Sequence, residues 1–307
     1  MTKKKVNWKH WLPFYIMFLP GLIYMIVNNY MPLYGMQLAF KSFSYAKGIK
    51  DSTWIGLKNF KFLFATKDAF IMVRNTLLYN ILWIFIGAVL GITVAILFNE
   101  IQNRFAKKFY QTAILLPYLI SIVVVAYLVY AFLATDTGLV NNAIVKGLLG
   151  KEEGIAWYME PKYWPFILTF VQQWKQIGFG MLLYLASILG IDKSYYEAAM
   201  LDGATKWQQI RRITLPLLKP TVITLVILNM GQIFRSDFGL FYQVPMNQGP
   251  LYSTTQTIDT YVYRALMVNN NIGMSAAASF LQSIVGFIFI VAANWIVRRF
   301  DKESSLF

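Results

Sequence analysis

The stretch NTLLYNILWIFIGAVLGITVAILF, residues 75–98, is apolar at most positions and carries no charged side chain. The hydrocarbon core of a bilayer is ~30 Å thick and a helix rises ~1.5 Å per residue, so about 20 mostly apolar residues span it. Residues 75–98 therefore predict a transmembrane helix.

Five further stretches have the same character. They lie at residues 11–36, 109–133, 163–189, 217–234 and 274–297. Trp and Tyr stand near several ends, as in Trp11, Tyr163 and Trp295, where they fit interfacial anchors. We therefore predict an all-α integral membrane protein with about six transmembrane helices.

Composition excludes several classes of function. Of the 307 residues 57% are hydrophobic and 14% charged, whereas a soluble domain carries about 25% charged residues. There is no cysteine and one histidine, His10, so disulfides, thiolate metal sites and a histidine relay are not expected. The net charge of +14 is spread between apolar runs, which favours anionic lipid headgroups over nucleic acid as its partner.

Basic residues predict the orientation. With both termini inside, the cytoplasmic segments hold Lys3, Lys4, Lys5, Lys9, Arg104, Lys107, Lys108, Lys193, Lys206, Arg211, Arg212, Lys219, Arg298, Arg299 and Lys302. The outer segments hold acids, namely Asp136, Glu152, Glu153 and Glu160. We expect the first span to be retained, because its apolar run is too long for a signal peptide.

The outer stretch 37–74 departs from this bias, since it carries seven basic residues. Within it, residues 57–73 alternate aromatic residues with lysines. Two interpretations stay open, namely an amphipathic helix on the outer membrane surface and a folded extracellular loop.

The segment between the fourth and fifth spans, residues 190–218, has strong local signals. Ser194 and Glu197 predict a capping box and a helix start, Gly203 predicts a turn, and Thr205 with Gln208 predicts a second capping box. We expect the second helix to run through Arg212, whose charge suits a helix C-terminus, and to end at Pro216. These signals predict two short helices at an angle on the cytoplasmic side.

The same segment resembles a known family. Glu197-Ala198-Ala199, three residues, Gly203, nine residues, Ile213, one residue and Leu215-Pro216 match the EAA loop of binding-protein-dependent ABC importer permeases of type I. FYQTAILLP at 109–117, residues 190–192 and residues 258–264 resemble the carbohydrate and polysaccharide branch of that family.

The resemblance implies that the loop is a coupling helix that docks on a cytoplasmic ATPase. The docking residues would be Glu197, Ala198, Ala199, Asp202, Gly203, Ile213, Leu215 and Pro216. Simpler roles stay open for some of them: Glu197 can cap its helix, Gly203 can serve the turn, and Pro216 can end the element. It further implies one permease domain over residues 1–307, with a core at about 71–298 and the coupling loop at 190–218.

Polar residues inside spans are candidates for the substrate pathway, because lipid makes them costly. They are Gln172, Trp174, Lys175, Asn229, Gln232, Arg235 and Gln282. Contacts between helices explain them equally well, and Lys175 could instead snorkel or pair with Asp237. The outer loop 239–273, with Pro245, Asn247 and Pro250, is expected to be polar and to face a solute-binding protein.

The expected function is that of a permease subunit of an importer for oligosaccharides or polysaccharide fragments, in the plasma membrane of a bacterium. Expected partners are a second EAA-type permease, an ATPase dimer that binds ATP and Mg²⁺, and a solute-binding protein. The chain contains no GxxxxGK[ST] motif, so we expect it to be no enzyme and to hold no cofactor or metal. An ion-coupled carrier would need acidic residues inside the spans, and a membrane enzyme would need a catalytic cluster.

Overall fold

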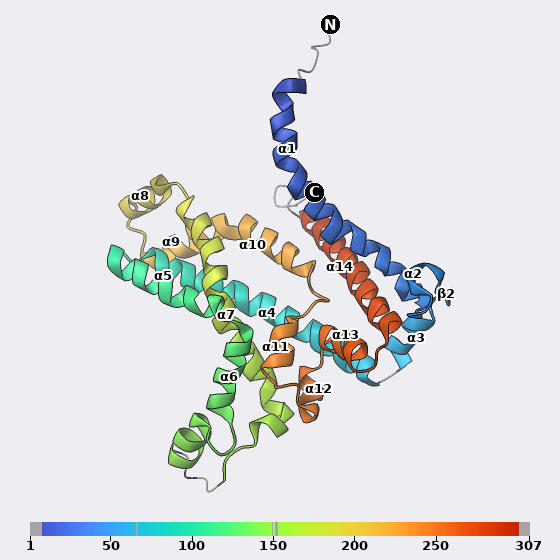
Figure 1. The fold of residues 1–307 in the computed structure, drawn as a ribbon. Coiled ribbons are helices and arrows are strands. Elements are labelled where there is room, and N and C mark those ends of the chain that lie inside the picture. Colours follow the sequence, from blue (N-terminus) through green and yellow to red (C-terminus); the bar gives the residue numbers. More distant parts are fainter. Residues whose placement is uncertain (1–7, 66, 149, 151–152, 301–307) are drawn as a thin grey trace. The chain divides into compact units, whose positions relative to one another are not determined.

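The computed structural model describes residues 8–65, 67–148, 150 and 153–300, and Figure 1 shows them to be largely helical. Lys3, Lys4, Lys5, Glu152 and Lys302, used above to predict orientation, lie outside these residues. The chain divides into two compact units: residues 1–65 with 264–281, and residues 66–263 with 282–307.

The first unit begins with a long helical run. Its elements are α1 (Trp8–Met25), the π-helical η1 (Ile26–Tyr30), the 3-10 helix η2 (Met31–Phe40), β1 (Lys41–Ser42), α2 (Gly48–Asp51), β2 (Thr53–Trp54) and α3 (Lys58–Ala65). From Trp11 through Tyr34 the side chains are exposed at nearly every position. A helix that is apolar all round and uncovered by protein fits a lipid environment.

The stretch 37–65 is a folded loop followed by a short helix. Strands β1 and β2 pair in antiparallel register, Lys41 opposite Trp54. The buried Lys41 donates from Nζ to the carbonyl oxygens of Ile49 (2.9 Å) and Lys50 (3.0 Å). Of the stretch 57–73, expected as one amphipathic helix, Lys58–Ala65 forms the helix α3, whereas the residues from Lys67 onward belong to the long helix α4.

The second unit holds most of the remaining helices. They are α4 (Lys67–Asn99), α5 (Arg104–Leu119), α6 (Ile122–Leu133), η3 (Val140–Leu148), η4 (Trp157–Met159), η5 (Pro161–Tyr163), α7 (Trp164–Leu189), α8 (Lys193–Leu201), α9 (Lys206–Gln209), η6 (Ile210–Thr214), α10 (Leu215–Met230), α11 (Phe238–Gln243), η7 (Gly249–Leu251) and α12 (Tyr252–Thr255). Two more, α13 (Ile258–Met267) and α14 (Ile272–Phe300), contribute residues to both units.

Four helical runs of the described chain are long and apolar enough to cross a membrane, and there are up to six if each of two bent pairs is one span. The four are Trp11–Phe40, Lys67–Asn99, Lys206–Met230 and Ile272–Arg299. The all-α class and the number of possible spans agree with the prediction made from the sequence. The fifth predicted span differs at its end, since α10 stops at Met230 and a turn follows.

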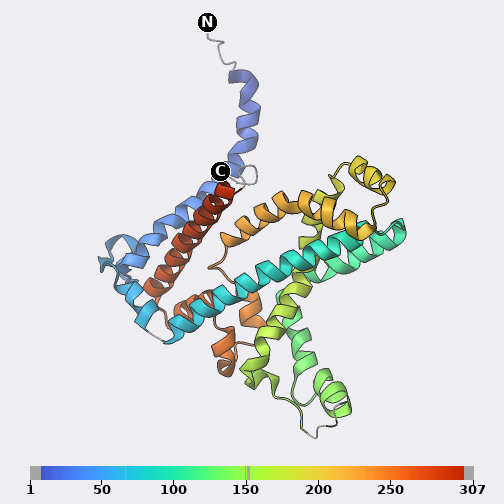
Figure 2. The same ribbon diagram turned by 180° about the vertical axis from the view of Figure 1, so that it is seen from behind.

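The third predicted span, residues 109–133, is not one straight helix. Helices α5 and α6 meet at 95°, visible from both sides in Figures 1 and 2. Ile120 and Ser121 have extended backbones (ψ 131° and 140°), three and four residues after Pro117. Proline weakens the helix, and a broken span persists where neighbouring side chains bind the freed backbone groups.

Two apolar clusters hold the second unit together. One packs Tyr79, Trp83, Trp164 and Leu168 against Leu240, Phe241, Val244 and Leu251. The other packs Ala95 and Phe98 of α4 against Met181, Tyr184, Leu185 and Ile188 of α7 and Leu218 of α10. The second cluster packs the end of α4 against the end of α7, where the loop 190–218 begins, and against the start of α10, where the loop returns.

Candidate functional site

Residues 190–218 fold into a helical elbow, which we define as α8, the turn after it, α9 with η6, and the first residues of α10. Asp192 caps α8, because its Oδ1 accepts from Ser194 N at 2.9 Å. That hydrogen bond lowers the pKa of the Asp192 carboxyl group. The capping box expected at Ser194 and Glu197 is therefore wrong, and the helix begins at Lys193 instead.

The turn of the elbow is the one that the sequence predicts. Gly203 has a φ of +75°, a conformation that glycine adopts without steric cost. Ala204 N donates to Ala199 O at 2.8 Å and closes the end of α8. The capping box of α9 is confirmed: Thr205 N donates to Gln208 Oε1 (2.7 Å), and Gln208 N donates to Thr205 Oγ1 (3.4 Å).

Pro216 does not end the second helix, contrary to the expectation. The run continues from Lys206 to Met230, so Arg211 and Arg212 do not lie at a helix C-terminus. In the π-helical segment η6, Leu215 N donates to Ile210 O, five residues back. The proline lies directly after this wider turn, which accommodates the hydrogen bond that proline cannot make.

The residues proposed for docking lie largely on the surface of the elbow. Glu197, Ala198, Asp202, Gly203, Leu215 and Pro216 are exposed, while Ala199 and Ile213 are half-buried. Sequence reasoning missed the apolar residues beside them, Leu201 (89% exposed), Trp207 (68%) and Met200 (55%). Large apolar side chains gathered on a polar loop mark a surface for a partner. The sequence could have indicated this surface, because all three residues lie within the EAA motif at 197–216.

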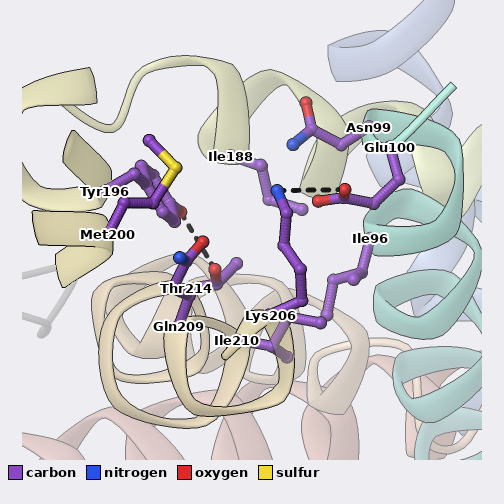
Figure 3. Close-up of a pocket in the computed structure, with 10 residues that line it drawn as sticks. All are labelled: Ile96, Asn99, Glu100, Ile188, Tyr196, Met200, Lys206, Gln209, Ile210 and Thr214. Carbon is purple, nitrogen blue, oxygen red and sulfur yellow. Dashed lines mark hydrogen bonds and ion pairs between the residues drawn. The ribbon is translucent and has the colours of Figure 1, made fainter. Parts of the chain in front are cut away.

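The elbow is anchored to the helices beneath it (Figure 3). Lys206 Nζ lies 3.2 Å from Oε2 of Glu100, which is the residue directly after α4. Tyr196 Oη and Thr214 Oγ1 are 2.9 Å apart and join α8 to η6. Ile96, Ile188 and Met200 are among the residues that line a cavity of about 120 Å³ between these elements. The elbow therefore has internal hydrogen bonds and an attachment to a long span.

A second hollow is a polar groove of about 420 Å³ between α4, α7 and α10. Five side-chain amides line it: Asn80, Gln172, Gln173, Gln176 and Asn229. Two of them, Gln172 and Asn229, are sequence candidates for the substrate pathway. Asn80 was missed, although an asparagine inside an apolar run is itself a signal. Amides facing a groove can exchange hydrogen bonds with a polar solute.

Trp174 and Lys175 are not among the groove-lining residues. Lys175 is buried, and its Nζ donates to Pro117 O (3.2 Å) and Ile120 O (2.5 Å) at the break between α5 and α6. It thus neither snorkels nor pairs with Asp237, whose Oδ1 accepts from Leu240 N. Trp174, the residue directly before Lys175 on α7, is 36% exposed.

The remaining candidates flank a non-helical segment at residues 231–237. Gln232 and Arg235 are exposed. Gln282 is buried and donates from Nε2 to Phe234 O (2.8 Å) and Asp259 Oδ2 (3.2 Å). Gln282 therefore has a structural role in holding this segment.

The loop 239–273 is not the long polar surface that its composition predicts. It folds into α11, η7, α12 and α13, and Leu240, Val244 and Leu251 are fully buried. Thr255, Gln256 and Thr257 are buried as well. Of the three residues expected to face a binding protein, Pro245 is buried, Asn247 is half-buried with a φ of +48°, and Pro250 is exposed.

Within the described ranges, no group of three or more His, Cys, Asp or Glu residues could hold a metal ion. The site is thus an elbow with an exposed apolar face, connected through packed helix ends to a groove lined by amides. This arrangement offers mechanical contact and polar recognition.

Comparisons with known proteins give a consistent result. Residues 84–302 match the model of the family described as binding-protein-dependent transport system inner membrane component. Protein LplB of Bacillus subtilis (strain 168) is 32% identical, with 96% of this chain and 90% of that protein covered. The polygalacturonan/rhamnogalacturonan transport system permease protein YteP of the same organism is 33% identical, with 94% and 89% covered.

Solved structures agree. A bacterial ABC transporter involved in the import of the acidic polysaccharide alginate matches with a TM-score of 0.86 and 32% identity, covering 96% of this chain and 98% of that chain. The alginate transporter in complex with an alginate pentasaccharide-bound periplasmic protein matches with a TM-score of 0.85 and 32% identity, covering 97% and 99%.

Proposed function

Since this chain belongs to the family of binding-protein-dependent transport system inner membrane components, we propose that it forms one half of the pathway of an ATP-driven importer and transmits the ATPase movement through its elbow. It is an ABC importer permease for sugars or polysaccharides and a multi-pass membrane protein.

The observation that carries the coupling proposal is the exposed apolar face of the elbow. Leu201 and Trp207 project from α8 and α9 on either side of Gly203, uncovered by any other described part of the chain. We assign this face, with Glu197, Ala198, Ala199, Asp202, Gly203, Ile213, Leu215 and Pro216, to a groove of a cytoplasmic ATPase. ATP and Mg²⁺ belong to that ATPase, and the permease itself needs no cofactor.

The elbow has the construction that a mechanical coupling requires. The hydrogen bond between Tyr196 and Thr214 opposes bending within it, and the ion pair between Lys206 and Glu100 connects it to the end of α4. The second helix continues into α10 without a break, so a displacement of Trp207 reaches Asn229 in the groove along one helix. Rigid elements of this kind carry motion between distant sites.

We propose alternating access as the transport cycle. A loaded solute-binding protein docks on the outer side, ATP closes the ATPase dimer inside, and the elbow moves with it. The amides Gln172 and Asn229 then receive the sugar from the outside, and ATP hydrolysis restores the inward-open state. A second EAA-type permease supplies the other half of the pathway, and we favour a heterodimer in the plasma membrane of a bacterium.

The binding protein would meet the exposed tip of the loop 239–273. Gln248, Gly249 and Pro250 are exposed there, as are residues 267–270, whereas residues 254–266 are buried or half-buried. Deleting residues 245–254 would remove the buried Leu251 and the carbonyl oxygens of Ser253 and Thr254, which accept from Asn75 and Tyr79. Single substitutions at Gln248 and Pro250 test the surface without that damage.

Reconstitution tests the proposed function. The chain is co-purified with the ATPase, second permease and binding protein encoded by neighbouring genes, and placed in liposomes. We expect ATP hydrolysis to rise when sugar-loaded binding protein is added, together with sugar uptake. Failure of the ATPase to co-purify, combined with sugar uptake that does not depend on ATP, would reject it.

A further inference from the structure

The segment after α10, residues 231–237, is a turn followed by non-helical chain, and Asn80 of the polar groove binds its backbone. Helix α10 is apolar and ends at Met230, and α11 begins at Phe238. Backbone without helical hydrogen bonds is tolerated at the end of a span where protein groups bind it or where it lines a cavity. Interrupted helices of this kind often form the binding sites of transporters.

Side chains from distant elements bind this backbone. Asn80 Nδ2 donates to Ile233 O (2.9 Å) and Arg235 O (2.8 Å), while Gln282 Nε2 donates to Phe234 O (2.8 Å). Three consecutive carbonyl oxygens are therefore held by two amides.

The backbone of the next residue, Ser236, is held by the carboxylate of Asp259. Asp259 Oδ2 accepts from Ser236 N (2.6 Å) and Ser236 Oγ (2.8 Å), and it also accepts from Gln282. These bonds fix the backbone on both sides of Arg235 and leave its side chain outside the network.

Arg235 is the charged residue of this segment that remains available. Its side chain is exposed, and it makes no hydrogen bond or ion pair with the part of the chain that the structure describes. Its carbonyl oxygen receives the amide of Asn80, which lines the polar groove. No Asp or Glu is among the residues that line the groove.

We propose that Arg235 recognises a carboxylate of the substrate, which makes the substrate an oligosaccharide of uronic acids. The proposal rests on the proposed function, because it assigns the groove to the sugar. A guanidinium group binds a carboxylate with two parallel hydrogen bonds, while the groove amides suit sugar hydroxyl groups. A backbone held at four consecutive residues places the cation at low entropic cost.

The test uses the complete transporter in liposomes with its binding protein. Uptake of 1,4-linked uronic acid trisaccharides is compared with uptake of the matched neutral trisaccharides. Each value is divided by the fraction of binding protein that the trisaccharide occupies, which removes the selectivity of that protein. The variants are Arg235→Gln and Arg235→Lys, and Lys162→Gln is the control because Lys162 is an exposed cation in another loop.

We expect Arg235→Gln to lower uronate uptake by about tenfold, the loss typical of a hydrogen bond to a charged group, and to leave neutral uptake unchanged. Arg235→Lys retains most uronate uptake, and Lys162→Gln retains all of it. Equal loss of both sugars, or no loss of uronate uptake, overturns the role of Arg235 while the importer function stands. Uptake of neutral sugars alone by the unmodified transporter overturns it too. Uptake of neither class contradicts the importer function, and this inference falls with it.

Discussion

Lys206 Nζ lies 3.2 Å from Glu100 Oε2, so the first residue of α9 is paired with the residue that follows α4. Both side chains are about half exposed or more, at 67% and 46%. Such a pair contributes about 0–1 kcal/mol to folding. Its importance is therefore geometric: it connects the elbow to a span of the groove.

Reversing one charge of this pair should reduce coupling more than stability. In Glu100→Lys the two cations repel each other, and we expect fewer sugar molecules imported per ATP hydrolysed with the thermal midpoint of the purified complex almost unchanged. The double variant Glu100→Lys with Lys206→Glu restores the attraction and should recover most of the transport. A double variant as poor as the single one would show that the pair itself has no role.

Gly203 provides a test of the turn. No atom lies within 4 Å of the position that a Cβ would occupy, so its constraint is the φ of +75° and not space. Leucine in this left-handed conformation costs about 1–2 kcal/mol, whereas asparagine tolerates it better. We expect Gly203→Leu to impair uptake while the chain still assembles in the membrane. Gly203→Asn should retain uptake, and equal activity of the two variants would contradict the turn as the cause.

The crossing of α5 and α7 depends on a small residue. A Cβ at Gly178 would lie 2.3 Å from Ile114 O, whereas a Cβ at Gly180 meets nothing within 4 Å. Gly178→Ala should therefore lower the melting temperature of the detergent-solubilised protein by several degrees, consistent with about 1–3 kcal/mol for overpacking. Gly180→Ala is the matched control, and its melting temperature should equal that of the unmodified protein.

Lys175 should be essential to the bend between α5 and α6. Lys175→Met removes the donor to Ile120 O and Pro117 O, and a buried carbonyl group left without a partner costs about 1–3 kcal/mol. We expect a lower melting temperature and reduced uptake. Trp174→Phe, the neighbouring exposed position on α7, should change neither. Unaltered melting of Lys175→Met would mean that the break does not need this lysine.

The sequence predicts the apolar spans well, because their length and composition follow directly from the thickness of a bilayer. It also predicts the turn at Gly203 and the cap at Thr205, since both depend on neighbours within three residues. It misses the break at Ile120 and Ser121, where the carbonyl oxygen of Ile120 accepts from Lys175, more than 50 residues away. A contact between distant helices leaves no local pattern.

The loop 239–273 illustrates a second limit. Its threonines and amides suggest a surface, yet Thr257 N donates to Thr260 Oγ1 and Ile258 N donates to Thr76 Oγ1 inside the fold. Asn75 Nδ2 donates to Gln256 O across a sequence separation of 181 residues. Composition alone cannot tell a polar side chain that faces water from one that binds buried backbone. The same ambiguity hid the structural role of Gln282.

Site-directed cross-linking tests the central claim most directly, because the chain has no cysteine of its own. Leu201→Cys places a single thiol on the exposed face of the elbow, and Pro250→Cys places one on the loop 239–273. In sealed vesicles that contain the complete transporter, the thiol at 201 should cross-link to the ATPase and resist modification by reagents added outside. Modification of the thiol at 201 from outside, without any cross-link to the ATPase, would contradict the elbow as the coupling element.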